Sequence, residues 1–262
     1  MSNSSELNKV QDKKVSKING IFGLISFSTI LPLNIHTTIK EMAMFTWIWP
    51  MIGTLIGIIV GAFGFLIVDL FHLPILIAAA MIYSFSIWFT GFHHLDGLID
   101  FGDGMMVHGS PGKKISVMRD KRIGTGGIAY LLMVGLISFA AIESSPLILI
   151  FYVLLISEMA AKMGIVTCAT FSKAFPDGTG RPFIESMNKK MLLLSLIISL
   201  ALGFLIFNTI GIVGIAMGLL AGLIIAFISK KSFIWATGDV LGTSNEVARM
   251  LSLVIMVTLL LI

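Results

Sequence analysis

The chain has 262 residues, of which 56% are hydrophobic and only 12% are charged, with a formal net charge of +4. Soluble domains carry about 25% charged residues, so this chain has too few to cover a surface that faces water. These figures exclude a soluble enzyme and a disordered chain, and the single cysteine, Cys168, excludes a disulfide scaffold. They favour an all-α membrane domain built from several helices.

Uncharged apolar segments predict the membrane-spanning helices. We expect seven spans, two of which arise from one long uncharged run, 191–229, that is divided at residues 208–211. Residues 21–35 are apolar but too few to cross a bilayer, so we expect a short re-entrant or interfacial segment there. The five remaining spans are predicted at residues 42–68, 75–92, 123–142, 147–171 and 245–262.

Lysine and arginine residues gather in three of the predicted connections, which are residues 93–122, 172–190 and 230–244. The short turns near Asp69, Glu143 and Asn208 contain no basic residue. The positive-inside rule therefore places the three long loops in the cytoplasm, with the chain as a multi-pass protein of the cell membrane. Residues 1–19 are expected to form a polar, basic tail ahead of a single membrane domain, 20–262.

The first of these loops contains three aspartates, Asp96, Asp100 and Asp103, at positions i, i+4 and i+7. On a helix this spacing places the three carboxylates on one face. No lysine or arginine lies within residues 91–107, so the three charges would repel one another without a cation among them. Carboxylate oxygens suit Mg²⁺, which also binds substrate phosphates. We therefore predict a Mg²⁺ site, with a solvated acidic loop as the alternative.

Two further segments have the composition of phosphate sites. Arg119 and Arg122 are spaced to hold one phosphate together, and Gly124 opens the third span, where free N–H groups bind anions. A basic anchor followed by a flexible helix start explains this segment equally well. In the second loop, residues 177–182 combine two glycines with Arg181, which is typical of a phosphate nest or of an ordinary turn.

The third loop contributes Asp239, and Glu246 follows it near the start of the last predicted helix. Glu246 lies 16 residues before the end of the chain, about 24 Å of helix, which places it near the cytoplasmic edge of the membrane. All four polar clusters are therefore expected on one side of the membrane. Inside the fourth span, Glu158 and Lys162 lie at i, i+4, where an ion pair between them is expected.

Residues 90–104, TGFHHLDGLIDFGDG, resemble the T-G-G-x-H-x-D-G-L-x-D-x-x-D-G signature of the cobalamin synthase (adenosylcobinamide-GDP ribazoletransferase) family. Residues 118–127 resemble that family's M-x-D-x-R-I-G-T-x-G segment, and residues 237–246 resemble its T-G-D-x-x-G-x-x-x-E stretch. Residues 27–32 and 49–57 are similar to its amino-terminal pattern. The resemblance thus extends over most of the chain.

The resemblance implies a membrane phosphotransferase that joins adenosylcobinamide-GDP to α-ribazole, bearing a 5′-hydroxyl, or to its 5′-phosphate. Adenosylcobalamin, or its 5′-phosphate, and GMP would be the products, with Mg²⁺ held by the three aspartates on the pyrophosphate. Either His94 or the aspartate least engaged with the metal, taken as Asp103, would accept the proton, and Asp239 and Glu246 would bind ribazole or a second metal. The residues expected to neutralise GDP are Arg119, Arg122 and Arg181.

The sequence departs from the signature at Phe92, which replaces a glycine, and at His93, which is an additional histidine. A CDP-alcohol phosphotransferase is an alternative, but the arginine that its motif requires is absent after Asp96 and Gly97. A cation transporter, the second alternative, needs carboxylates near mid-span, where only Glu158 is predicted. We expect no nucleic-acid partner, and the sequence leaves open whether the chain forms a homo-oligomer.

Overall fold

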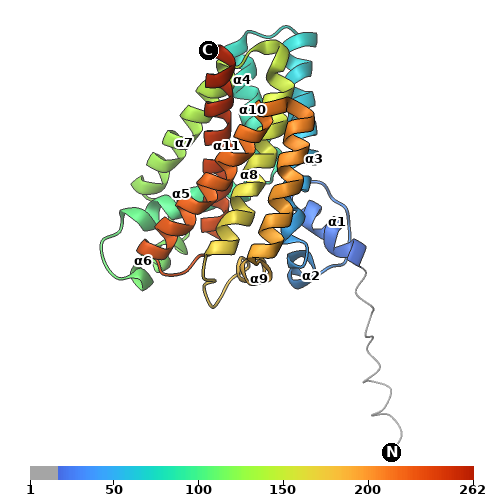
Figure 1. The fold of residues 1–262 in the computed structure, drawn as a ribbon. Helices are drawn as coiled ribbons and strands as arrows, with labels where there is room; N and C mark the ends of the chain where they lie inside the picture. The colour runs from blue at the N-terminus through green and yellow to red at the C-terminus, as the bar shows by residue number, and fades with distance from the viewer. Residues whose placement is uncertain (1–16) are drawn as a thin grey trace, which may run out of the picture.

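The computed structural model describes residues 17–262, which form eleven α-helices and no β-strand (Figure 1). The prediction of an all-α membrane bundle is therefore confirmed. Most of the polar tail predicted at residues 1–19 lies outside the described residues, because the description begins at Lys17.

The helices follow in chain order as α1 (Lys17–Ser28), α2 (Ile39–Ala43), α3 (Trp49–Phe65), α4 (Ile75–Phe89), α5 (His93–Met106), α6 (Pro111–Met118), α7 (Thr125–Glu143), α8 (Ile150–Phe171), α9 (Arg181–Ser186), α10 (Lys189–Ser232) and α11 (Gly238–Leu261). Three short turns of 3₁₀ or π helix adjoin α3 and α8 and cover Thr46–Ile48, Leu66–Leu70 and Leu147–Leu149.

Five segments in the described part of the chain are long and apolar enough to span a membrane, namely Thr46–Leu70, Thr125–Glu143, Leu147–Phe171, Lys189–Ser232 and Gly238–Leu261. Helices α4 and α5 qualify only as a pair, and the chain bends by 93° between them. With the 44-residue segment Lys189–Ser232 counted once, the structure thus gives five or six candidate spans and does not confirm the predicted count of seven. It also corrects the start of the last helix from Asn245 to Gly238, since Thr237 is the last extended residue before it.

Helix α10 contains 44 residues and reverses direction near its middle. Phe207 and Asn208 leave the helical conformation, with φ at +50° for Asn208, a region that asparagine tolerates better than most residues. The two arms are in close contact beside this break. A Cβ atom added to Gly211 would collide with the backbone of Gly203. In Figure 1 both orange arms descend from this break. The predicted division of the uncharged run at residues 208–211 is confirmed.

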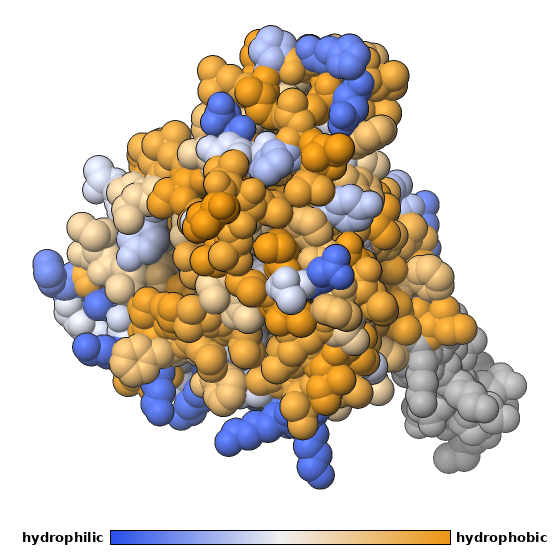
Figure 2. Space-filling view, turned by 45° about the horizontal axis from the view of Figure 1, so that its top comes forward, coloured by the Kyte–Doolittle hydropathy of each residue, from blue (hydrophilic) through white to orange (hydrophobic). Residues whose placement is uncertain are grey.

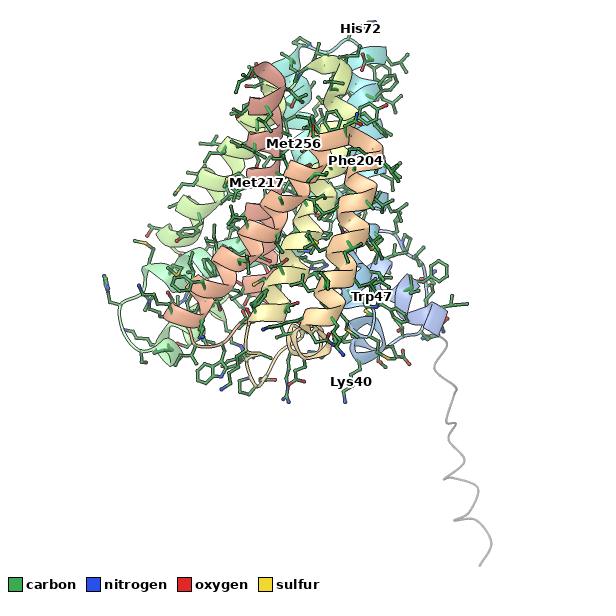
Figure 3. All side chains as sticks on the ribbon, viewed as in Figure 1. Lys40, Trp47, His72, Phe204, Met217 and Met256 are labelled. Carbon is green, nitrogen blue, oxygen red and sulfur yellow. The ribbon has the colours of Figure 1, made fainter. Side chains whose placement is uncertain are left out.

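Helix α8 occupies the centre of the bundle and packs against α3, α10 and α11. In its most apolar stretch 78% of residues are buried, against 39–50% in the other four candidate spans. The surface in Figure 2 is largely apolar, with hydrophilic residues mostly toward its margins, as expected where lipid surrounds the helices. Lys40 and His72 mark the two opposite ends of the bundle (Figure 3).

The short helices α2, α6 and α9 lie at the end of the bundle marked by Lys40 (Figure 1). Helix α1 has 12 residues, about 18 Å in length, and is too short to cross a bilayer. This agrees with the expectation of a non-spanning segment near residues 21–35. The same end of the bundle therefore gathers the amino-terminal segment and the loops that carry the predicted site residues.

Candidate active site

A cavity of about 330 Å³ lies where segments far apart in the sequence meet at this end of the bundle. Asp96 and His94 of α5 reach it, together with Gly180 of the second loop and Asp239 of α11. Three of the four predicted polar clusters thus share one cavity, and the segment with Arg119 and Arg122 lies outside its lining. The lining consists of Phe27, Trp49, His93, His94, Asp96, Ile165, Thr179, Gly180, Phe183, Gly238, Asp239, Leu241 and Gly242.

A sharp turn between α4 and α5 sets the direction of the helix that carries the aspartates. Gly91 and Phe92 both have positive φ, +69° and +60°, and the chain turns by 93°. A left-handed conformation is uncommon for a large residue such as Phe92, which replaces a glycine of the family signature. After the turn, Gly97 presses against α11, where an added Cβ would lie 2.9 Å from the Asp239 Cα. This close approach places the two acidic segments side by side.

Asp100 lies within electrostatic range of three other carboxylates. Burial, followed by repulsion from Asp239, Asp96 and Asp103, raises the pKa of Asp100 to about 7. The Thr237 hydroxyl donates a hydrogen bond of 2.9 Å to Asp239. Within residues 17–262, no ion pair involves Asp96, Asp100 or Asp239. The described residues therefore give this cluster no paired cation.

The oxygen donors of this cluster suit a hard divalent cation. Among the described residues, no three His, Cys, Asp or Glu side chains are arranged to hold a metal ion by themselves. Mg²⁺ commonly binds through one or two carboxylates, with water and substrate phosphates at its remaining positions. Asp96 lines the cavity and Asp100, one helical turn later in α5, does not. A Mg²⁺ ion at Asp96 would therefore take most of its ligands from water and a phosphorylated substrate.

Asp103, the third aspartate of the predicted triad, lies at a different place. It is 7% exposed, and its two oxygens accept hydrogen bonds from the N–H groups of Gly124 at 2.7 Å and Gly127 at 2.8 Å. These N–H groups are at the start of α7, so the chain's own carboxylate fills the anion site predicted there. Asp103 thereby joins α5 to α7. The two hydrogen bonds orient the Asp103 carboxylate toward the start of α7. Each oxygen has a further lone pair that can accept a proton or bind a metal ion.

His94 is buried beside the cavity, and none of residues 17–262 forms a hydrogen bond with its Nδ1 atom. Burial, and then the positive charges of Lys162 and Arg249, lower the pKa of His94 well below its ordinary value. The imidazole is therefore neutral near pH 7 and has a nitrogen able to accept a proton. His93, its neighbour, stacks on the ring of Phe27 with 6.1 Å between centroids.

The three arginines predicted to bind GDP do not line the cavity, although Arg181 directly follows Gly180 of its lining. Each forms an exposed ion pair, namely Arg119 with Asp177 at 3.2 Å, Arg122 with Asp120 at 2.8 Å and Arg181 with Glu185 at 2.7 Å. Hydrogen bonds from Arg122 also lower the pKa of Asp120 to about 2. Exposed pairs contribute little to stability, so these arginines can exchange their carboxylate partners for phosphate oxygens.

Glu246 is buried in the bundle and belongs to a network of charged side chains instead of to the cavity lining. Arg249 donates hydrogen bonds to Glu246 and to both oxygens of Glu158, at 2.7 and 3.2 Å. Lys162 donates to Asn245 at 2.7 Å, and Asn245 donates to Glu246 at 2.9 Å. The expected pair of Glu158 with Lys162 is therefore wrong, because the planar guanidinium of Arg249 binds both oxygens of Glu158.

Three aromatic residues for which we predicted no role form one wall of the cavity. The ring of Phe183 lies 5.2 Å from that of Phe27 and 5.1 Å from that of Trp49, measured between centroids. Trp49 is held in place by a hydrogen bond of 2.7 Å to Ser28. The motifs at residues 27–32 and 49–57 include Phe27 and Trp49, whereas no motif signals Phe183, since aromatic residues are common at membrane edges.

Comparisons with known proteins identify the family of this chain. The sequence profile of the cobalamin-5-phosphate synthase family matches residues 20–257. The adenosylcobinamide-GDP ribazoletransferase of Methanosarcina barkeri (strain Fusaro / DSM 804) is 32% identical, over 89% of this chain and 90% of its own. The enzymes of that name from Methanococcoides burtonii and Methanocella arvoryzae are 32% and 33% identical, over 83% and 91% of this chain and 83% and 95% of theirs.

No solved structure matches the chain. The sequence match nevertheless covers residues 20–257, and the relatives align over most of their own length. The chain therefore belongs to the cobalamin-5-phosphate synthase family.

Proposed function

We propose that this protein is a Mg²⁺-dependent phosphotransferase of the cell membrane with adenosylcobinamide-GDP as donor. The acceptor is α-ribazole, bearing a 5′-hydroxyl, or its 5′-phosphate, and the products are adenosylcobalamin, or its 5′-phosphate, and GMP. The relatives are named for a transfer of this kind. The observation on this chain that carries the proposal is the cavity in which His94, Asp96 and Asp239 meet. Its loops face the cytoplasm, since the basic residues lie at that end.

In the proposed reaction, a ribazole hydroxyl oxygen forms a bond to the phosphorus on the cobinamide side of the pyrophosphate. The bond from that phosphorus to the GMP oxygen breaks, and the hydroxyl proton passes to a base. Asp96 and Asp100 would hold Mg²⁺, which when bound neutralises charge on the transferring group and on the departing GMP. His94 would be the base, since it lines the cavity and its Nδ1 atom has no hydrogen-bond partner among residues 17–262.

The remaining predicted residues act around this centre. The aromatic wall of Phe27, Trp49 and Phe183 offers a stacking surface for a flat base of either substrate. Arg119, Arg122 and Arg181 would bind GDP phosphates once their exposed ion pairs open. Asp239 would bind ribazole at the cavity lining, and Asp103 would position Gly124 at the start of α7.

The charged residues inside the bundle do not favour cation transport, the alternative function. Glu158 and Glu246 both accept hydrogen bonds from Arg249, and Asn245 joins Lys162 to the same network. Carboxylates that bind a transported cation need free oxygens along a path through the membrane. We therefore assign a structural role to this network. It holds α11 in register against α8, so that Asp239 faces the cavity.

The test is GMP release by the purified full chain in detergent, supplied with adenosylcobinamide-GDP, α-ribazole and Mg²⁺. Parallel reactions omit the acceptor, replace it by its 5′-phosphate, or contain a chelator in excess over Mg²⁺. Asp100→Ala is the active-site variant, and Asp69→Ala, an exposed aspartate near His72 at the opposite end, is its matched control. We expect release that needs acceptor and Mg²⁺, persists in Asp69→Ala and is lost in Asp100→Ala. Absence of release from folded wild-type protein would overturn the proposal.

A further inference from the structure

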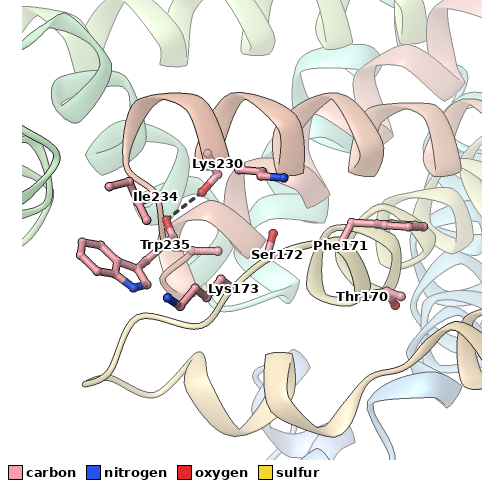
Figure 4. A pocket seen from close by; sticks show the side chains of 9 residues that line it. Thr170, Phe171, Ser172, Lys173, Lys230, Ile234 and Trp235 are labelled. Atoms are coloured by element: carbon pink, nitrogen blue, oxygen red, sulfur yellow. Dashed lines mark hydrogen bonds between the residues drawn. The ribbon is translucent and has the colours of Figure 1, made fainter.

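A second cavity, of about 480 Å³, lies where α8 and α10 end, and it shares no lining residue with the candidate active site (Figure 4). Lys173 follows the end of α8, and Lys230 belongs to the last turn of α10. Ser172, Phe171, Ile234 and Trp235 also line it. Nothing in the proposed transfer reaction uses these side chains.

The charge of this cavity is entirely positive. Two lysines line it, together with hydroxyl groups such as that of Ser172, and no aspartate or glutamate is among its lining residues. The Lys173 ammonium lies 5.9 Å from the centroid of the Trp235 ring, over its face. Two ammonium groups and hydroxyl donors without an acid are the groups that bind a phosphate anion.

The backbone holds the two sides of the cavity together. The N–H of Ala236 donates to the carbonyl of Lys173 at 2.8 Å, and the N–H of Phe175 donates to the carbonyl of Ala236 at 2.9 Å. The Ser229 hydroxyl donates to the carbonyl of Trp235 at 2.9 Å, as the dashed line in Figure 4 shows. These bonds fix the end of α8 against the segment that follows α10, so the lysines belong to a built cavity rather than to two independent loops.

Ile234 has a strained backbone at the edge of this cavity. Its φ is +69°, a left-handed conformation that is a true outlier for a β-branched residue, and its side chain is 46% exposed. Such strain persists only where surrounding structure imposes it, and it gathers at ligand-binding sites. Here the strained backbone directs the Ile234 side chain outward beside two lysines. Because this side chain is exposed, its burial in the protein does not offset the strain.

The cavity also borders the surface expected to face lipid. Helices α8 and α10 both belong to candidate membrane spans that end at it. Phe171 is 44% exposed, and Phe227, which precedes Lys230 by one turn of α10, is 67% exposed. Tryptophan and lysine at the end of a spanning helix mark the level of the lipid headgroups. An apolar rim of this kind offers no contact to a free phosphate, whereas the acyl chains of a lipid can pack against it.

We propose that this cavity binds the phosphate headgroup of an anionic phospholipid. Lys173 and Lys230 contact the phosphate, Ser172 donates a hydrogen bond to it, and the acyl chains lie along α10 beside Phe227. Basic cavities between spanning helices are typical sites for anionic headgroups. A lipid headgroup and a soluble phosphate both present the same anionic group to the lysines. The apolar rim beside them favours the lipid.

The test uses the full chain in vesicles of phosphatidylcholine that contain increasing fractions of brominated phosphatidylglycerol or, separately, brominated phosphatidylcholine. Bromine quenches tryptophan fluorescence at short range, and the difference between wild type and Trp235→Phe isolates the signal of Trp235. We expect phosphatidylglycerol to quench Trp235 at lower mole fraction than phosphatidylcholine does. Each lysine near an anionic headgroup contributes about a fivefold preference, so Lys173→Gln with Lys230→Gln should lower the preference about 25-fold.

The matched control is the double variant Lys189→Gln with Lys190→Gln, which removes two exposed lysines at the start of α10 that do not line the cavity. It should retain the preference, and replacement of the two cavity lysines by arginine should restore it. Equal quenching by the two lipids, or an equal loss in both glutamine variants, would overturn the proposal. Displacement of the lipid by inorganic phosphate at constant ionic strength would assign the cavity to a soluble anion and overturn it as well.

Discussion

Helix α11 carries acidic residues in two places that differ in how their charge is balanced. Glu246 lies inside the bundle with Arg249, Glu158 and Lys162 near it, and hydrogen bonds connect each of these charges to a partner. Asp239 lies seven residues earlier, about 10 Å along the helix, beside carboxylates of α5. Among the described residues it forms no ion pair with a cation. Both places contain carboxylates, but those inside the bundle are paired with cations and those beside α5 are not.

The difference indicates what each place is for. A charge inside the bundle must be paired, because an uncompensated ion away from water costs several kcal/mol. At the membrane edge, water reduces that cost, and carboxylates without a cation remain available to a ligand. The paired network therefore holds the helices, whereas the unpaired cluster binds what the reaction brings to it. Substitutions in the two places should consequently separate stability from activity.

The largest expected effect is from Arg249→Met, which leaves Glu158 and Glu246 buried without a partner. Breaking a buried pair by removing one side costs about 3–5 kcal/mol of unfolding free energy. We expect a large fall in the thermal unfolding midpoint in detergent, together with loss of GMP release. A midpoint equal to that of the wild type would mean that the network does not hold α11 against α8.

Asp100→Asn should have the opposite profile. It removes a charge that only other carboxylates surround, so the unfolding midpoint should not fall. GMP release should decrease at least about 100-fold, equivalent to roughly 2.7 kcal/mol of transition-state stabilisation. A reduced midpoint with unchanged specific activity would reverse the roles that we give to the two places.

Gly97→Ala tests the close approach of α5 to α11. The added Cβ would lie 2.9 Å from the Cα and the carbonyl oxygen of Asp239, so the two helices must separate. Overpacking of this kind costs about 1–3 kcal/mol, and GMP release should fall about tenfold because the two acidic segments move apart. Gly112→Ala is the control, since a Cβ there has nothing within 4 Å. Equal behaviour of the two variants would contradict a role for this contact.

Arg122→Gln should have the smallest effect. The Arg122 side chain is 89% exposed, and its one ion pair within the described residues is with Asp120, so the unfolding midpoint should not change. If this arginine binds a GDP phosphate, the KM for adenosylcobinamide-GDP should rise by less than about tenfold and kcat should stay the same. Steady-state kinetics at low ionic strength, where an exposed charge has most influence, provide the measurement. An unchanged KM there would remove Arg122 from the substrate site.

The fold was largely predictable because spans depend on uncharged runs, which are read directly from the sequence. The break of α10 was predictable from Asn208 and its neighbours for the same reason. The start of α11 was not, because residues 238–244 contain glycine, serine and threonine, which are weak helix formers. Packing on α5 maintains the helix there, and Thr243 donates a hydrogen bond of 3.1 Å to the carbonyl of Gly97.

The candidate site was predictable in its residue types but not in its pairings. Spacing placed Asp96, Asp100 and Asp103 on one face, yet it contained no information on the N–H groups of α7 that occupy Asp103. In the same way, the i, i+4 spacing of Glu158 and Lys162 permitted a pair that an arginine 91 residues away prevents. Local spacing limits which partners are possible, and only the packing of separate helices selects among them.

The reversal of α10 at Phe207 and Asn208 also has a consequence for biosynthesis. No charged residue lies between Lys190 and Lys230, so the ribosome delivers both arms as one uncharged hairpin whose tip carries a single asparagine across the bilayer. An even number of crossings returns the chain to the side from which it departed. Because the break at Phe207 and Asn208 makes α10 cross twice instead of once, Asp239, which follows α10, is on the same side of the membrane as Asp96, which precedes it.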